Sequence, residues 1–326
     1  MSHDKPKLVI VDTDPGVDDA MAILFLHASP KVQVVSLTAV FGNADVATTT
    51  QNAAYLADRF NIDVPTFEGA DNPFARPRYV PELRVHGKDG YGDTNLAASY
   101  KTPDTKISAV EHIIETVKQH PHQITLLGLA PLTNFALALQ KAPEIAELVA
   151  EVVIMGGAFG RKGRTGNIKP NAEANVFYDP EAADLVFAAN WPVTVIGLDV
   201  TVDCMLPAKS TLGLAESGGD AGHFLWEISR GYEEVYKKFD GVDGCCIHDV
   251  AAAAYVTNPS WFKTKEHRIM VKLDGDDLGQ TVVVDNNLSR PFHKIAETVE
   301  SHKVISSYVD SIEALGKAFP NDLPSS

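Results

Sequence analysis

The stretch Lys7–Asp19, KLVIVDTDPGVDD, determines how the rest of the chain is interpreted. Its first half, Lys7–Asp12, is a short apolar run rich in Val and Ile, which predicts a buried strand. Pro15-Gly16 then predicts a loop, and apolar residues at helical spacing follow from Asp18 to His27. The stretch therefore predicts a strand, a loop and the start of a helix, with carboxylates gathered between strand and helix.

The same alternation continues along the chain. Further strands are predicted at 32–40, 64–67, 124–129, 151–155 and 193–198, and helices at 46–60, 107–120, 132–140 and 180–189. Strands that alternate with helices predict an α/β fold, with an open, mostly parallel central sheet and helices on both faces. The near-continuous apolar run Val193–Leu198 fits a sheet that is buried on both faces.

The last third has a different pattern. It is mainly helical from about Leu206, with two β-like runs at Arg268–Leu273 and Gln280–Val284, and a helix is predicted from about Phe292 to Leu315. No repeat, low-complexity tract or Pro/Gly/Ser linker divides the chain, so one domain over 1–326 is predicted. Long irregular stretches at 68–106 and 156–170 are typical of functional or mobile loops.

Composition narrows the possible partners. The 43 acidic and 28 basic residues give a net charge of −15 without a long single-sign run, which argues against a nucleic-acid partner. The first residues lack the pattern of a signal peptide, and no apolar run approaches the length of a membrane span. Only three cysteines are present, and their positions indicate no set of disulfide bonds. A cytoplasmic location and no membrane association are expected.

The run Asp12–Asp19 carries the strongest chemical signal. It places four carboxylates within eight residues, where a strand ends and a helix begins, and ligands of open α/β sheets bind at the carboxyl ends of strands. These carboxylates repel one another unless something positive lies among them. An all-oxygen site suits calcium or magnesium rather than zinc. The alternative is an acidic helix cap without a ligand, although four carboxylates exceed what capping requires.

Other polar residues are predicted at the same edge of the sheet. Asn43 follows the second strand, and Asn167, Glu173 and Asn175 follow the strand that ends at Met155. A His-Asp pair, His248 and Asp249, opens a late helix. Each of these is a weak signal alone, and such a pair is commonly a helix cap.

Together these residues resemble the inosine-uridine-preferring nucleoside hydrolases. The resemblance rests on DTDPGVDD (12–19), VFGN (40–43), MGGAFG (155–160), NAEANVFYDPEAA (171–183) and the late His-Asp pair, in this order over roughly the first 255 residues. It implies a nucleoside hydrolase-like fold with Ca²⁺ at the floor of a deep pocket, and cleavage of the bond between ribose and base in free nucleosides.

The resemblance also implies roles for individual residues. Asp14, Asp19 and Asp249 would bind calcium by side chain and Leu129 by its carbonyl, and Asp14 would also be the general base. The residues expected to hold the ribose hydroxyls are Asp18, Asn167, Glu173 and Asn175. Asn43 would support the metal and sugar site, Met155 would line the ribose pocket, and His86 would lie on a mobile loop that closes over the substrate.

Specificity is inferred from the last third of the chain. Tyr232 and Tyr236, one helical turn apart, match tyrosines that approach the base in broadly specific members, and His248 matches the proposed acid for the leaving group. Two departures from the family pattern affect substrate preference, namely a basic insert at 160–164 and Ala174 in place of an aromatic residue. Inosine and uridine are the expected substrates, with a pyrimidine preference left open.

Two alternatives come from other classes of protein. Asp12 and Asp14, one residue apart after an apolar strand, also satisfy the minimum pattern of a haloacid-dehalogenase-type phosphotransferase, but that chemistry does not require Asp18 and Asp19. The other alternative is a nucleoside binder that lacks turnover, which loss of the water-activating carboxylate would mark; Asp14 is present. The family resemblance further implies a homodimer or homotetramer.

Overall fold

The central feature of the fold is an eight-stranded sheet. The computed structural model describes residues 5–80, 85–102 and 104–318. The strand order in the sheet is β3-β2-β1-β4-β5-β6-β12-β9. In chain order these strands are β1 (Lys7–Thr13), β2 (Val32–Ala39), β3 (Thr66–Phe67), β4 (Ile124–Gly128), β5 (Glu151–Met155), β6 (Val193–Ile196), β9 (Phe262–His267) and β12 (His293–Val299).

The sheet is parallel except at one edge. β1 pairs in parallel with β2 on one side and β4 on the other, and parallel pairing continues to β3, β5, β6 and β12. Only β9, the edge strand, runs antiparallel to its neighbour β12. The prediction of an open, mostly parallel sheet is therefore confirmed.

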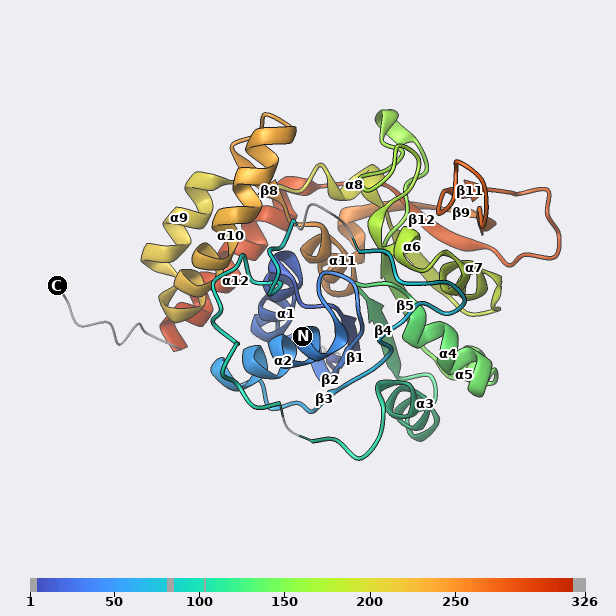
Figure 1. Ribbon diagram of the computed structural model, residues 1–326, viewed down its shortest axis with the longest axis horizontal. Helices are drawn as coiled ribbons and strands as arrows, with labels where there is room; N and C mark the ends of the chain where they lie inside the picture. Colours follow the sequence, from blue (N-terminus) through green and yellow to red (C-terminus); the bar gives the residue numbers. More distant parts are fainter. Residues whose placement is uncertain (1–4, 81–84, 103, 319–326) are drawn as a thin grey trace.

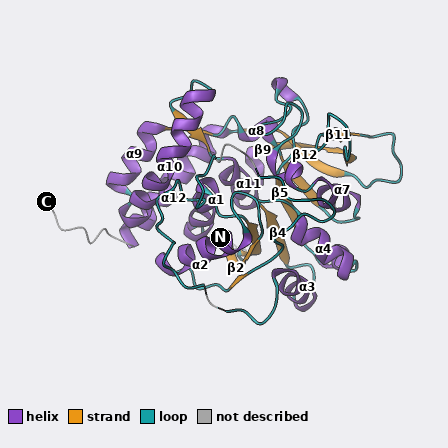
Figure 2. Ribbon diagram, in the orientation of Figure 1, coloured by secondary structure: helices purple, strands orange, loops and turns teal. Residues whose placement is uncertain are grey.

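Helices cover both faces of this sheet (Figures 1 and 2). One face carries α1 (Val17–Ala28), α2 (Val46–Arg59), α10 (Gly219–Phe239), α11 (His248–Thr257) and α12 (Ser301–Ala318). The opposite face carries α3 (Ala109–Gln119), α4 (Thr133–Lys141), α5 (Ile145–Leu148) and α7 (Pro180–Ala188). In β1, Val9 and Val11 pack on the first face and Ile10 on the second. Because both faces are buried, the middle of this strand, Leu8–Val11, is entirely apolar.

Shorter elements complete the chain. The remaining helices are α6 (Ala174–Tyr178), α8 (Leu198–Thr201), α9 (Ala208–Ser217) and the 3₁₀ turns η1 (Arg161–Gly163) and η2 (Pro259–Trp261). Two antiparallel pairs lie outside the main sheet, formed by β7 (Met205–Pro207) with β8 (Gly244–Cys246) and by β10 (Ile269–Val271) with β11 (Thr281–Val283). The second pair confirms the two β-like runs predicted near the C-terminus.

The predicted helix from Phe292 to Leu315 is wrong in its first part. Residues His293–Val299 form strand β12, and α12 begins only at Ser301. β12 lies between β6 and β9, so its backbone groups are paired on both sides. This pairing outweighs the local helical pattern. The edge strand β9 is absent from the sequence-based prediction.

The two irregular stretches are confirmed. The described residues between β3 and α3 contain no helix or strand, and 156–170 contains only the short turn η1 and the isolated bridge residue Lys169. Residues 81–84 and 103 of the first stretch lie outside the described part of the chain. Among the described residues, no helix is both long and apolar enough to cross a membrane.

The strand order points to one end of the sheet as the candidate ligand site. From β1, the chain adds β2 and β3 on one side and later adds β4, β5 and β6 on the other. The order reverses between β1 and β4, and open α/β sheets bind ligands beyond the carboxyl ends of the strands at such a point. The loop that follows β1 is the carboxylate-rich segment.

Candidate active site

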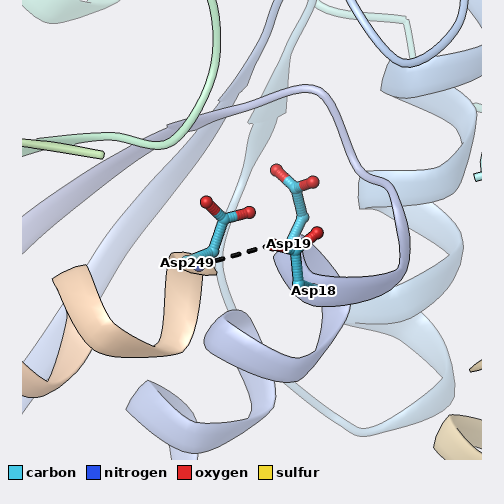
Figure 3. A group of neighbouring side chains, drawn as sticks. All are labelled: Asp18, Asp19 and Asp249. Atoms are coloured by element: carbon cyan, nitrogen blue, oxygen red, sulfur yellow. Dashed lines mark hydrogen bonds between the residues drawn. The ribbon is translucent and has the colours of Figure 1, made fainter. Parts of the chain in front are cut away.

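Three carboxylates meet at the N-terminal turns of α1 and α11 (Figure 3). Asp18 and Asp19 lie in the first turn of α1 and Asp249 in the first turn of α11, and one oxygen from each lies within 4.8 Å of the others. The backbone N–H of Asp249 donates to Asp18 Oδ2 at 3.4 Å, which joins residues 231 positions apart in sequence. All three are buried, so their mutual repulsion is weakly screened by water.

Asp19 is held on both carboxylate oxygens. The hydroxyl of Thr13 donates to Oδ1 at 2.5 Å, and the N–H of Gly16 donates to Oδ2 at 2.9 Å. The side-chain amide of Asn43 donates to the same Oδ2 at 3.2 Å. These contacts fix the orientation of the carboxylate.

Asp14 lies beside this group with one oxygen fixed and one unpaired. The N–H of Asn43 donates to Oδ2 at 2.7 Å, and the Asn43 side chain donates to the Asp14 carbonyl at 3.1 Å. Oδ1 is buried and has no hydrogen-bond partner among the described residues. Gly42 permits this arrangement, because a Cβ at that position would collide with Asp14 Oδ2. The site thus contains an orphaned buried oxygen next to three converging carboxylates, which fits a bound cation.

Burial raises the pKa values of these carboxyls. For Asp14, burial is the main cause and the charge of Asp19 adds to it, so its pKa lies well above the ordinary value. Burial and then the charge of Asp19 raise the pKa of Asp18 to about 8. Burial and then the charge of Asp18 raise the pKa of Asp249 well above the ordinary value. Protons therefore occupy part of the ion-free cluster near neutral pH, and a divalent cation would displace them.

These pKa shifts predict how stability depends on pH without divalent cations. Between the pKa of unfolded Asp, about 3.9, and that of Asp18 in the fold, about 8, the folded protein binds more protons than the unfolded chain. The free energy of unfolding should therefore fall as pH rises through this window. Bound calcium should oppose the fall, so the gain in Tm on adding calcium should grow with pH.

Thermal unfolding followed by circular dichroism at about pH 5.5 and about pH 8 measures this linkage. The protein is first passed over a chelating resin, and calcium is then added back to half of each sample. A calcium-induced gain in Tm of equal size at both pH values would contradict the prediction.

Three of the four predicted ribose-binding residues, Asn167, Glu173 and Asn175, lie on or before α6, and the fourth, Asp18, lies in α1. Glu173 caps α6: Oε1 accepts from Asn175 N at 2.9 Å, and Oε2 accepts from Gly157 N at 2.9 Å. Asn175 donates its side-chain amide to the carbonyls of Leu129 at 2.9 Å and Met155 at 3.2 Å. The structure therefore brings Leu129, Met155, Glu173 and Asn175 together at the ends of β4 and β5.

Asn167 is less enclosed than the other predicted sugar ligands. It is exposed, and its side-chain oxygen accepts from the N–H of Ala174 at 2.9 Å. That contact orients the amide group and leaves its N–H₂ for a ligand.

His86 closes over the carboxylate loop. Its Nδ1 accepts from the N–H of Val17 at 3.1 Å and lies 3.9 Å from Asp18 Oδ1. Burial, with a smaller effect of the charge on His248, lowers the pKa of His86 to about 3, so its ring is neutral. The ring stacks on Tyr232 at a centroid distance of 4.9 Å. The structure thus places His86 against both the acidic cluster and the predicted base-binding tyrosines.

Tyr232, Tyr236 and His248 form one hydrogen-bonded group, in which Tyr232 and His248 are buried and Tyr236 is half-buried. The Tyr236 hydroxyl lies 2.8 Å from His248 Nε2 and 3.4 Å from the Tyr232 hydroxyl, which donates to the Cys246 carbonyl at 3.1 Å. The other ring nitrogen of His248 lies 2.7 Å from the Thr201 hydroxyl. Burial, with a smaller effect of the Arg164 charge, lowers the pKa of His248 to about 4. The His248 ring is therefore neutral at neutral pH, whereas an unperturbed histidine has a pKa closer to neutral pH.

Several supporting residues were missed by the sequence analysis. Asn52 in α2 donates to the carbonyls of Pro15 at 3.1 Å and Asp89 at 2.7 Å, which ties the carboxylate loop to the segment carrying His86. Thr38 and Asn134 donate to Asp12 Oδ1 at 2.6 and 2.8 Å. Even so, burial raises the pKa of Asp12 to about 7. Thr201 and these residues come from separate elements and form no local sequence motif.

The chain matches known proteins over nearly its whole length. Residues 9–306 match the family model described as inosine-uridine preferring nucleoside hydrolase. Uridine nucleosidase 1 of Arabidopsis thaliana is 37% identical over 289 residues, covering 88% of this chain and 84% of the relative. The inosine-uridine preferring nucleoside hydrolase of Leishmania major is 35% identical over 316 residues, covering 95% and 99%. A solved plant nucleoside hydrolase is 33% identical, with a TM-score of 0.88 and coverage of 95% and 99%.

Proposed function

Because this chain belongs to the inosine-uridine preferring nucleoside hydrolase family, we propose that it hydrolyses inosine and uridine with calcium held at the carboxylate cluster. The chain is an enzyme of the nucleoside hydrolase class, which cleaves the N-glycosidic bond of ribonucleosides. This membership leaves the phosphotransferase alternative without support. The finer proposal concerns the substrates, the ion and the residues that act on them.

One observation carries the proposal. The buried, unpaired Oδ1 of Asp14 lies next to the carboxylates of Asp18, Asp19 and Asp249, at the carboxyl end of β1. Oxygen donors at such a site suit a hard cation, and calcium accepts six to eight of them in flexible geometry. Asp14, Asp19, Asp249 and the Leu129 carbonyl are the proposed ligands. When bound, the ion would hold and orient the attacking water.

Asp14 is the proposed general base. Asn43 fixes its Oδ2, so Oδ1 is the atom left to accept a proton from water. Calcium is a weak Lewis acid, and a carboxylate next to the water therefore has to take the proton. Asp14 is buried and held in place, which lets it perform this step without reorganisation.

The sugar becomes cationic as the glycosidic bond breaks, much as in O-glycoside hydrolysis. Buried acidic groups around the ribose favour that charge in the transition state more than they favour the neutral substrate. We assign this role to Asp18 and Glu173. Because the Asn175 amide donates to Leu129 and Met155, its side-chain oxygen is the atom left to accept a ribose hydroxyl. Asn167 offers its N–H₂ to the sugar from the rim.

His248, the acid predicted from the sequence, is assigned the role of assisting the departure of the base. Its ring is neutral at neutral pH, so it assists as a hydrogen-bond donor that acts through Nε2 by way of Tyr236, rather than as an imidazolium ion. Tyr236 lies between this nitrogen and Tyr232. A donor placed where negative charge develops on the base lowers the barrier to its departure.

Location and assembly are proposed from the sequence. All three cysteines are buried and unpaired, which is consistent with a reducing cytoplasm. Assembly into a homodimer or homotetramer follows from the family resemblance, and light scattering on the purified protein measures it.

The proposed function predicts calcium-dependent release of ribose and base. Protein freed of divalent cations on a chelating resin is incubated with inosine or uridine, and both products are quantified. Calcium should restore equal release of the two products more fully than magnesium or zinc. Restoration by zinc alone would contradict the assignment of an all-oxygen calcium site. Inactivity on every nucleoside, together with hydrolysis of p-nitrophenyl phosphate, would overturn the function itself.

A further inference from the structure

Thr201 lies behind His248, on the side of the ring away from Tyr236. It ends the short helix α8, and its hydroxyl is buried 2.7 Å from His248 Nδ1. His248 Nε2 lies 2.8 Å from the Tyr236 hydroxyl. Thr201, His248 and Tyr236 thus form a hydrogen-bonded chain that leads towards the proposed base site. Each member of such a chain has a donor or an acceptor role, and the surroundings decide which.

The hydrogen of the Thr201 hydroxyl has one available acceptor among the described residues. A helical Thr hydroxyl commonly donates to the carbonyl four residues earlier, which here belongs to Gly197. That carbonyl accepts from the N–H groups of Val200 and Thr201, both at 3.1 Å, and no hydrogen bond joins it to the Thr201 hydroxyl, whose one partner among the described residues is His248 Nδ1. The hydroxyl hydrogen is therefore directed to His248 Nδ1. A neutral imidazole has one donor and one acceptor, so Nε2 carries the ring hydrogen and donates to Tyr236.

The far end of the chain is fixed as well. A carbonyl oxygen only accepts, so the Tyr232 hydroxyl gives its hydrogen to Cys246. Because Tyr236 accepts from His248, its own hydrogen points away from the ring. It is then available to a bound base, or to the Tyr232 oxygen at the longer distance of 3.4 Å. Hydrogen bonds in the chain thus run in one direction, from Thr201 to the ligand.

We propose that Thr201 is a positioning residue that fixes the Nε2–H form of His248 and so directs the Tyr236 hydroxyl hydrogen at the departing base. The proposal rests on the proposed function. Without the Thr201 hydroxyl, the ring is free to adopt the Nδ1–H form, in which Nε2 accepts the Tyr236 hydrogen. The hydrogen bonds would then run from Tyr236 towards Thr201, and the departing base would lose the hydrogen-bond donor that the Tyr236 hydroxyl supplies.

The kinetic test compares a poor and a good leaving group. Thr201→Val removes the hydroxyl with little change of shape and should lower kcat for uridine by roughly 10- to 100-fold, the loss typical when a residue that orients a metal-bound histidine is removed. It should lower kcat for p-nitrophenyl riboside far less, because p-nitrophenolate departs without a donor. Thr201→Ser keeps the hydroxyl and should recover most of the uridine rate. His248→Ala removes the imidazole itself, so its loss of kcat for uridine is the upper limit expected for any variant of Thr201.

A matched control separates this role from general loss of a buried hydroxyl. Thr194 is buried in β6 and contacts Tyr255, so Thr194→Val removes a comparable group outside the chain. It should leave the ratio of the two kcat values unchanged. An equal loss on both substrates for Thr201→Val, or failure of Thr201→Ser to recover the uridine rate, would show a merely structural role and overturn the proposal.

The tautomer of His248 gives a readout that does not need activity. Nitrogen-15 spectra of histidine-labelled protein distinguish Nε2–H from Nδ1–H, and the His248→Asn variant assigns the signal. The wild-type protein should show Nε2–H, and Thr201→Val should shift the population towards Nδ1–H. An Nδ1–H ring in the wild type would overturn the proposal even in an active enzyme. An Nε2–H ring in a protein that hydrolyses no nucleoside would instead overturn the proposed function.

Discussion

Asp14→Asn is expected to lower kcat for inosine by about 10²–10⁴-fold, the usual contribution of a general base, without unfolding the protein. The N–H of Asn43 requires an acceptor at the position of Oδ2. An asparagine would therefore turn its oxygen towards Asn43 and place its N–H₂ where Oδ1 lies. That group cannot accept a proton from water. The substitution also removes one negative charge from a repelling cluster, so the ion-free variant should be at least as stable as the ion-free wild type.

The measurement is kcat at saturating calcium, with Tm recorded with and without the ion. Asp58→Asn, which neutralises an exposed carboxylate on α2, serves as the control and should retain full activity. Near-normal inosine hydrolysis by Asp14→Asn would remove Asp14 from the role of base. Full recovery of the variant at high calcium concentration would show that Asp14 serves only as a metal ligand.

Ribonucleosides should exceed 2′-deoxynucleosides as substrates by about 10⁴–10⁵-fold in kcat/KM, because a buried polar site rejects an analogue that leaves its groups unpaired. Asp18 and Asn175 are the groups assigned to the vicinal hydroxyls. Asp18 is only 5% exposed, so water cannot readily replace a missing hydroxyl. Uridine and 2′-deoxyuridine are the test pair.

The variant Asn175→Ala supplies the matched comparison for this prediction. It should reduce kcat/KM for uridine more than kcat/KM for 2′-deoxyuridine, and so bring the ratio of these two values closer to one. A general disturbance of the site would lower both rates without changing that ratio. Comparable kcat/KM values for the two nucleosides with the wild-type enzyme would show that the ribose assignment is wrong.

The sequence predicts the parts of the fold whose signals are local. β1, the acidic loop and α1 are readable because a buried strand, a turn and a helix follow one another within 22 residues, from Lys7 to Ala28. β12 and β9 cannot be predicted from their local sequence in this way. In β9, the polar residues Lys263, Lys265 and Glu266 hide any strand pattern, and the segment is a strand because β12 lies beside it.

The residues of the candidate site also differ in whether the local sequence gives a signal for them. The carboxylates, His248 and the tyrosines belong to motifs or regular spacings, so the sequence alone identifies them as candidates. Asn52, Asn134 and Thr201 act through single hydrogen bonds to residues far away in sequence. An isolated Asn or Thr carries no signal of such a contact, because its role is set by the packing of elements. Only the three-dimensional arrangement identifies them.

The edges of the main sheet limit how this chain can associate with itself. β3 has only two residues, and β9 exposes Lys263, Lys265 and Glu266 along the other edge. Short strands and edge charges oppose the addition of a strand from another molecule. A continuous sheet running between two copies is therefore disfavoured, and so is edge-to-edge aggregation. A stable homo-oligomer of this protein is therefore expected to use surfaces other than the edges of the main sheet.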